Sequence, residues 1–159
     1  MRSLIYISVF VMITLQINAQ KEKLYDIDED PSEQFKEALD KAKNEDKHVM
    51  LQIGGNWCPW CYRFHDFVKH NAELDSIVRA NYILVNINFD PKQKNGLFKE
   101  LEYPQRFGFP VIVITDAYGK RLHTQNSWYL EDNKDSYDLK KFKTFLKNWT
   151  PEAVAPESF

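Results

Sequence analysis

Mostly apolar runs and helical apolar faces alternate along the chain. Three of these runs have the length of buried strands, and a fourth, more polar run follows a turn-forming sequence. These predicted strands span residues 48–53, 82–89, 111–115 and 121–124. Apolar residues spaced three and four apart predict helices in the segments between and around them. The predicted helices lie around residues 31–42, 60–68, 74–78, 97–107 and 139–149.

Capping residues indicate where the first and last helices begin. Asp30 precedes Pro31 and is followed three residues later by Glu33, which together form a capping-box pattern with proline at the first helical position. The last helix is expected to be capped near Ser136, and residues 151–159 are expected to form a loose tail.

The order of these elements predicts an α/β fold. Strands that alternate with helices form a sheet covered by helices on both faces. The hairpin expected after Pro110 adds an antiparallel strand, which makes the sheet mixed. With 43% hydrophobic residues, the chain can build one domain, placed at residues 20–150. Its net charge of −2 excludes a basic field that would recruit nucleic acid.

The N-terminal segment has the pattern of a secretory signal peptide. Arg2 supplies a positive charge, residues 3–19 are free of charge and largely apolar, and Ala19 is a small residue at the expected cleavage position. We therefore expect residues 1–19 to be removed and the protein to be periplasmic or secreted. The alternative is an N-terminal membrane anchor, because the charge-free stretch approaches the ~20 residues that a span needs.

The chain contains two cysteines, Cys58 and Cys61, separated by two residues. A disulfide that closes so short a loop removes little entropy from the unfolded chain, so a chemical role is favoured over a structural one. The pair follows a predicted buried strand and begins a predicted helix, a position that lowers the pKa of a thiol. We expect Cys58 to be the nucleophile and the more buried Cys61 to resolve the mixed disulfide.

A metal site is the alternative use of these cysteines. His65 and His70 follow on the same predicted helix, and Cys61 and His65 share a face. His70 points away from that face, and the spacing is shorter than in usual zinc sites with two cysteines and two histidines. We expect no metal and no bound cofactor, because the dithiol itself carries two electrons.

Residues 24–150 resemble the thioredoxin-like superfamily. The resemblance is carried by the strand 49–53, by Trp57-Cys58-Pro59-Trp60-Cys61, and by Phe109-Pro110 with the segment 111–120 that follows. It implies a thioredoxin-like fold, a central mixed sheet with helices on both faces. It also implies that Pro110 is cis beside the disulfide and that the backbone of Phe109 binds an extended substrate. By this resemblance the chain is similar to exported thiol–disulfide oxidoreductases.

Two positions depart from the pattern of the superfamily. Gln52 stands where members often carry a buried acid, and it cannot take up a proton. Trp60 stands where strongly oxidising members carry a histidine. The pattern therefore favours a reductase or isomerase of protein disulfides. A dedicated oxidant and a non-catalytic binding module remain alternatives.

The residues around the cysteines suggest how substrates bind. Trp57, Trp60, Phe109 and Pro110 are the expected substrate-binding residues, with Trp57 packed under the loop and Trp60 exposed. Uncharged aromatic residues suit protein substrates that bear disulfides or thiols. We expect a monomer that receives electrons from a membrane electron-donor protein, as the resemblance implies.

Overall fold

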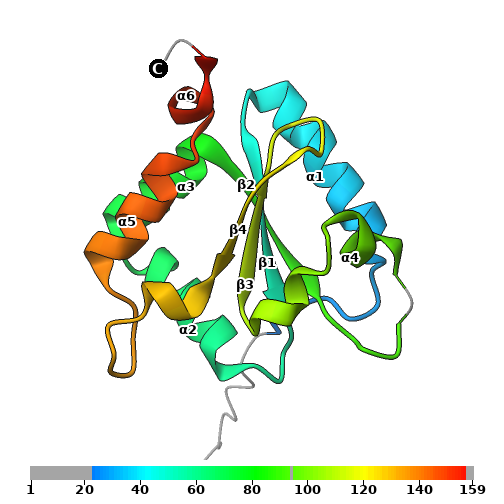
Figure 1. Ribbon diagram of the computed structural model, residues 1–159, viewed down its shortest axis with the longest axis horizontal. Helices are drawn as coiled ribbons and strands as arrows, with labels where there is room; N and C mark the ends of the chain where they lie inside the picture. The colour runs from blue at the N-terminus through cyan, green and yellow to red at the C-terminus, as the bar shows by residue number, and fades with distance from the viewer. Residues whose placement is uncertain (1–22, 94, 157–159) are drawn as a thin grey trace, which may run out of the picture.

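The structure is a computed structural model that describes residues 23–93 and 95–156. The predicted signal peptide, residues 1–19, lies outside the described residues. Four strands form one sheet in the order β2-β1-β3-β4 (Figure 1). Strand β1 (His48–Gly54) is parallel to β2 (Tyr82–Asn88) and antiparallel to β3 (Val111–Thr115), which pairs antiparallel with β4 (Arg121–Asn126). The predicted mixed sheet is confirmed.

Helices cover both faces of this sheet (Figure 1). Helices α1 (Pro31–Glu45) and α4 (Gly96–Glu100) pack on one face. The other face carries α2 (Pro59–Lys69), α3 (Ala72–Asn81) and α5 (Leu139–Asn148). Two short 3-10 helices, η1 (Pro104–Phe107) and η2 (Ser127–Leu130), and the helical turn α6 (Pro151–Val154) complete the described elements.

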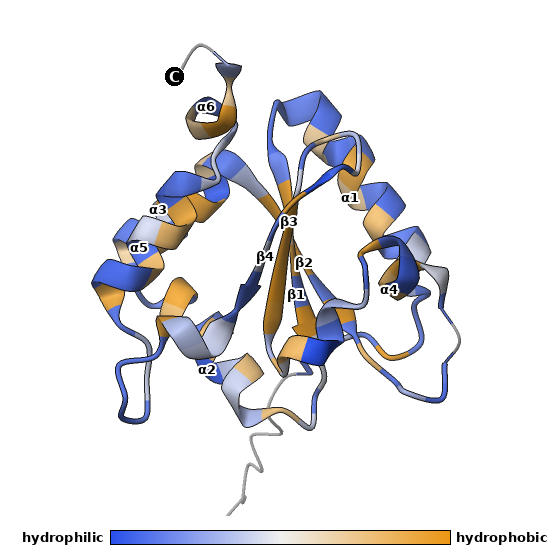
Figure 2. Cartoon of the chain, in the orientation of Figure 1, coloured by the Kyte–Doolittle hydropathy of each residue, from blue (hydrophilic) through white to orange (hydrophobic). Residues whose placement is uncertain are grey.

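The central strands divide their side chains between two cores. In β1, Val49, Leu51 and Ile53 pack toward α1, whereas Met50 packs toward α2 and α5. This division follows from the alternation of side chains along a strand. Every residue of β1 and β3 is buried, because helices cover both faces at the centre of the sheet. Figure 2 shows these strands as mainly apolar, while the helices carry polar residues on their outer surfaces.

Capping explains several helix ends. Asp30 caps α1 as predicted, accepting hydrogen bonds from the backbone N–H groups of Ser32 and Glu33. Asn71 accepts from the N–H of Leu74 and starts α3 as a separate helix after α2. The predicted cap near Ser136 is wrong, because Asp138 caps α5 through the N–H of Lys141 at 2.9 Å.

Two predicted segments differ from the structure. The single helix expected at 97–107 is divided into α4 and η1, because Pro104 lacks an N–H and Tyr103 before it has a left-handed backbone, with φ at 56°. The tail expected to be loose from residue 151 begins with α6. Thr150 caps this turn by accepting from the N–H of Ala153 at 3.1 Å.

Tyr82 provides a test of the packing between β2 and α5. Its side chain is buried, its hydroxyl donates to the Leu146 carbonyl at 2.6 Å, and burial raises the pKa of the phenol above its ordinary value of 10.0. In the unfolded chain Tyr82 ionises near pH 10, whereas in the folded protein it keeps its proton. Its contribution to the free energy of unfolding is therefore complete below pH 10 and declines above it. Tyr82 should contribute ~1.4 kcal/mol per pH unit to this decline.

Urea unfolding of the wild type and of Tyr82→Phe at several pH values between 8.5 and 11.5 measures this contribution. The free energy of unfolding of the wild type should fall more steeply with pH than that of the variant. Equal slopes for the two proteins would contradict the expectation.

Candidate redox site

The loop between β1 and α2 presents Cys58 at the start of a helix. The N–H of Cys58 donates to the Gly55 carbonyl at 3.0 Å, which closes a tight turn directly after β1. Cys58 is the N-cap of α2, with an extended backbone, and Pro59 occupies the first helical position. The motif therefore lies where a buried strand ends and a helix begins, as the sequence predicts.

Cys58 and Cys61 are joined by a disulfide, with their Cα atoms 5.3 Å apart. The Cys58 side chain is 4% exposed, whereas Cys61 is fully buried at 0%. The expectation that Cys61 is the more buried cysteine is confirmed. The backbone N–H of Cys61 donates to Cys58 Sγ at 3.2 Å. In the reduced protein the same donor, together with the helix N-terminus, favours a thiolate on Cys58.

The loop before β3 brings Phe109 beside this pair. The Phe109–Pro110 peptide bond is cis, as the resemblance implied. Strand β3 starts at the next residue, Val111, which pairs with Ile53 near the end of β1. Phe109 packs against the cluster formed by Tyr25 and the two cysteines.

The two tryptophans of the motif have the opposite exposure to that expected. Trp57 is 58% exposed. Its indole lies over Gly55 and meets Phe109 edge to face, with ring centroids 5.1 Å apart. Because Gly55 has no side chain, the ring can fold back across the loop. Trp57 is thus held in place and still open to solvent.

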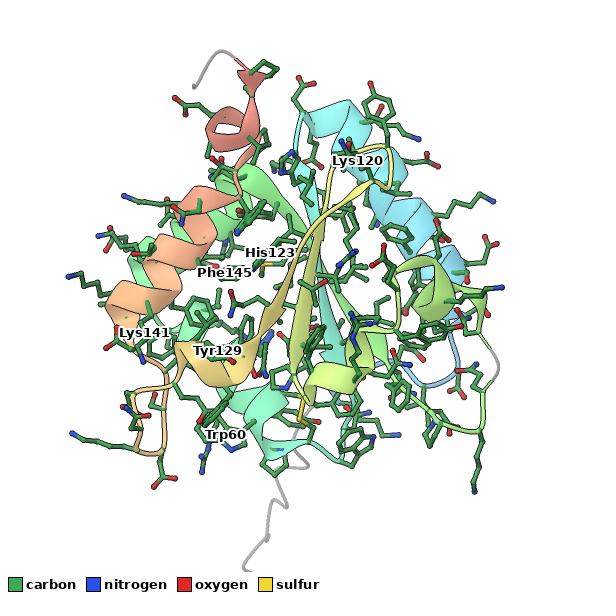
Figure 3. All side chains as sticks on the ribbon, in the orientation of Figure 1. Trp60, Lys120, His123, Tyr129, Lys141 and Phe145 are labelled. Carbon is green, nitrogen blue, oxygen red and sulfur yellow. A yellow bond between two sulfur atoms is a disulfide. The ribbon has the colours of Figure 1, made fainter. Side chains whose placement is uncertain are left out.

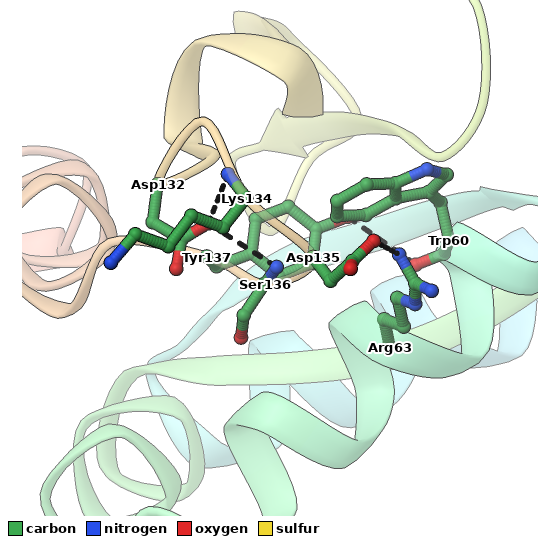
Figure 4. A network of polar contacts seen from close by, with 7 residues as sticks. All are labelled: Trp60, Arg63, Asp132, Lys134, Asp135, Ser136 and Tyr137. Carbon is green, nitrogen blue, oxygen red and sulfur yellow. Dashed lines mark hydrogen bonds and ion pairs between the residues drawn. The ribbon is translucent and has the colours of Figure 1, made fainter.

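Trp60 is half-buried because a distant segment covers it. Its ring packs edge to face on Tyr137 at 5.4 Å, and the Arg63 guanidinium lies 4.6 Å from its centroid. Arg63 also pairs with Asp135, in the turn before α5 (Figure 4). Figure 3 shows Trp60 on α2 and Tyr129 on η2. The predicted exposure of Trp60 is wrong, because contacts with residues more than seventy positions away are not encoded in the local pattern.

A groove adjoins the exposed tryptophan. Trp57, Phe109 and Phe89 form a row of aromatic rings with successive centroids 5.1 Å apart. The groove beside this row has a volume of about 560 Å³. It is lined by Ile27, Trp57, Asn88, Phe89, Asp90, Pro91, Lys92 and Gln93. Its lining combines the aromatic rings of Trp57 and Phe89 with polar residues of the loop after β2. A second hollow, of about 480 Å³ against β2, shares no lining residue with this site.

Gln52 lies beneath the cysteines and is fully buried. Its amide nitrogen donates to the Tyr25 hydroxyl at 2.8 Å and to the Cys61 carbonyl at 3.0 Å, while its Oε1 has no hydrogen-bond partner among the described residues. Where members of the superfamily often carry a buried acid, this protein therefore has a neutral hydrogen-bond donor, the Gln52 amide. Tyr25 enters the site through this contact.

Asn56 connects Tyr25 to the active loop. Its Oδ1 accepts from the Tyr25 N–H at 3.0 Å and its Nδ2 donates to the Tyr25 carbonyl at 2.8 Å. The hydroxyl of Tyr62 donates to the same Oδ1 at 3.0 Å. No motif marks Tyr25 or Asn56 in the sequence, because their relation depends on pairing across 31 positions.

The histidines of the alternative metal site do not join the cysteines. His65 is half-buried on α2, and His70 is exposed at its end, with Nδ1 2.8 Å from the Asp66 carbonyl. Across residues 23–93 and 95–156, no three side chains of His, Cys, Asp or Glu are grouped to hold a metal ion. Within the same ranges, no helix is long and apolar enough to cross a membrane.

Comparisons with known proteins agree with this geometry. The family model described as thioredoxin-like domain matches residues 35–128, and the chain belongs to this family. The solved disulphide isomerase from Xylella fastidiosa Temecula1 superposes with a TM-score of 0.65 at 25% identity, covering 80% of this chain and 97% of that one. The chain thus has a thioredoxin-like fold of the disulfide oxidoreductase type, with a Cys-x-x-Cys pair at its site.

A part of the chain also resembles a longer protein. Over 52 residues it is 35% identical to mouse spermatogenesis-associated protein 20. This match covers 33% of the chain and 7% of the mouse protein, and the human protein of the same name is 29% identical over the same length. The chain therefore corresponds to a small part of these relatives.

Proposed function

We propose that this protein is an extracytoplasmic thiol–disulfide oxidoreductase that reduces or isomerises disulfides in other proteins. One observation carries the proposal: Cys58 Sγ lies at the N-terminus of α2 and accepts the Cys61 N–H, with Cys61 buried directly behind it. This arrangement favours a thiolate on Cys58, the less buried of the two sulfurs, and keeps a second thiol within bonding distance.

The reaction follows from the two sulfur positions. The Cys58 thiolate attacks one sulfur of a client disulfide, whose S–S bond breaks. The departing client sulfur leaves with the bonding electron pair and takes a proton from water. Cys61 then loses its proton to water, and its thiolate attacks Cys58 Sγ. The second client sulfur departs, the Cys58–Cys61 disulfide forms, and two electrons have passed to the client.

The surroundings of the pair support a reductase or isomerase over a dedicated oxidant. The uncharged Trp60 stands next to Cys61, and the cation stacked on it, Arg63, is paired with Asp135. The Cys58 thiolate therefore receives its stabilisation from the helix N-terminus rather than from an adjacent imidazolium. The aromatic row and groove at Trp57 suit an extended, partly apolar client. The resemblance to a solved disulphide isomerase supports the same assignment.

Replacing Cys61 by serine tests the proposal. The variant keeps the attacking sulfur and lacks the resolving one, so mixed disulfides on Cys58 should accumulate. They appear as bands on non-reducing gels of cells producing the variant, and they collapse to one band with dithiothreitol. The double variant Cys58→Ser/Cys61→Ser is the matched control and should trap nothing.

Two further outcomes separate the alternatives. Absence of trapped clients, together with failure of the reduced wild type to reduce a test disulfide, would leave a binding module. The reduction potential measured against glutathione distinguishes a reductase or isomerase from a dedicated oxidant. A value near that of the strongly oxidising proteins, about −120 mV, would identify an oxidant and contradict the reductase assignment.

The location and partner are part of the same proposal. The uncharged apolar segment 3–19 supports export, and a reductant outside the cytoplasm needs electrons from a membrane electron-donor protein. We propose that it acts there as a monomer. Sequencing the N-terminus of the protein recovered from the periplasm or medium should give Gln20 as the first residue. Recovery from membranes with residues 1–19 intact would establish the anchored form instead.

A further inference from the structure

Tyr25 lies against the cysteine pair although it is far from the motif in sequence. Its side chain is 1% exposed and forms a small buried cluster with Cys58 and Cys61. A Cβ atom built on Gly54 would lie 2.3 Å from Cys61 Sγ and 2.8 Å from the Tyr25 hydroxyl oxygen. The sum of these two distances is an upper limit on the separation of sulfur and oxygen. The phenol is therefore a close polar neighbour of Cys61.

The hydrogen bonds of Gln52 determine what the Tyr25 hydroxyl can do. The Cys61 carbonyl can only accept, so the Gln52 atom that faces it must be the amide nitrogen. The same nitrogen donates to the Tyr25 oxygen, so both N–H groups of the Gln52 amide are used. Because the Tyr25 oxygen accepts in this bond, its own proton can be donated elsewhere. A donor that also accepts is polarised and donates more strongly.

We propose that the Tyr25 hydroxyl, polarised by Gln52, donates a hydrogen bond to the Cys61 sulfur when the disulfide is open. Tyr25 thereby stabilises the Cys61 thiolate that resolves the mixed disulfide. The inference rests on the proposed function, which it deepens by naming a further residue of the same site. Tyr25 and Gln52 together replace a buried carboxylate, by stabilising the deprotonated sulfur instead of removing its proton.

The surroundings of Tyr25 fit this role. Burial raises the pKa of Tyr25, so that its hydroxyl stays protonated and can donate at every pH at which a thiolate resolves a disulfide. The titratable groups that act on it are Tyr62 and Tyr137, both phenols, and no carboxylate is among them. Asn56 holds the Tyr25 main chain at two atoms, so the ring moves with the active loop rather than with the N-terminal segment.

The electron balance of the resolving step is unchanged by Tyr25. The S–S bond between Cys58 and the client breaks, and the bond between Cys58 and Cys61 forms. The client sulfur leaves with the electron pair as a thiolate, and the proton lost by Cys61 goes to water. Tyr25 keeps its own proton throughout. Its contribution is a charge-assisted hydrogen bond to Cys61, a kind of bond roughly twice as strong as a neutral one.

The reagent 5,5′-dithiobis(2-nitrobenzoate) separates the two steps in one experiment. Reduced full-length protein releases a first thionitrobenzoate when Cys58 attacks and a second when Cys61 resolves. Tyr25→Phe should slow the second release about tenfold at pH 7 and move its pH midpoint up by about one unit. The first release should keep its rate, because Cys58 is stabilised by the Cys61 N–H.

Tyr82→Phe is the matched control, because Tyr82 is also buried and its hydroxyl bonds the Leu146 carbonyl in another part of the molecule. Both of its phases should match the wild type. Unchanged second-phase kinetics in Tyr25→Phe, or equal slowing of both phases, would overturn the inference. If Tyr25→Phe fails to fold, as judged by circular dichroism, the variant Gln52→Met tests the same role of Tyr25. It removes the polarising donor, so it should slow the second phase selectively.

The two proposals fail in different ways. A wild type that completes both phases with the reagent but reduces no protein disulfide would overturn the proposed function. The assignment of Tyr25 would survive that result. A wild type that reduces proteins, with a second phase insensitive to Tyr25, would overturn only this inference.

Discussion

Replacement of Cys58 by serine should lower the rate of protein-disulfide reduction to that of the uncatalysed reaction. A hydroxyl does not ionise in the pH range in which the thiol does, so the attacking group is lost. Serine is at the same time a good N-cap, and Cys58 is the N-cap of α2. The fold should therefore survive, and the loss of activity reports on the chemistry alone. Reduction of insulin, followed by turbidity with dithiothreitol as electron source, measures it.

Comparison with the reduced wild type isolates the role of Cys58 in stability. The free energies of unfolding of Cys58→Ser and of the reduced wild type should agree within about 1 kcal/mol, because both lack the disulfide and retain a capping side chain. Turnover by Cys58→Ser at a rate close to that of the wild type would exclude Cys58 as the nucleophile.

Gly54→Ala should destabilise the protein by roughly 1–3 kcal/mol, a typical cost of overpacking. The new Cβ would come within 2.3 Å of Cys61 Sγ and 2.8 Å of the Tyr25 hydroxyl, closer than real Cβ contacts. Neither neighbour can move freely, because Cys61 is bound within α2 and Asn56 clamps Tyr25. A thermal scan of the oxidised protein should show a melting temperature lower by roughly 2–12 °C.

Gly96→Ala is the control for this substitution. A Cβ at Gly96 meets nothing within 4 Å, and the residue begins α4 without a positive φ. Alanine there should change the stability by less than ~1 kcal/mol, in the stabilising direction, since it restricts the unfolded chain. Equal melting temperatures for the two variants would show that the space at Gly54 does not limit the packing.

The elements that the sequence predicts well are those whose signals are local. The buried strands at Val111–Thr115 and His48–Gly54 are apolar runs, and α1 starts at an Asp-Pro cap. Such patterns depend on the period of side chains along one element and need no knowledge of its neighbours. The position of the cysteines between a strand and a helix follows from the same information, as does the greater burial of Cys61 over Cys58.

The segments that were predicted wrongly depend on single backbone features. The helix expected at 97–107 has the right apolar spacing, but Pro104 and the left-handed Tyr103 interrupt it. At α5, two side chains near the start could cap, and Asp138 rather than Ser136 faces the free N–H groups. Periodicity alone does not decide between such alternatives, because a cap depends on backbone angles.

The sequence by itself therefore determined the class of fold, the cysteine pair at a helix start and the neutral residue at position 52. Only the tertiary structure decided how that site is completed. It exposed Trp57 and covered Trp60 with Tyr137, and it brought Tyr25 to the buried sulfur. The physical reason is that exposure and hydrogen-bond partners are set by segments distant in sequence. Folding alone brings those segments together, and a local pattern of residues carries no record of them.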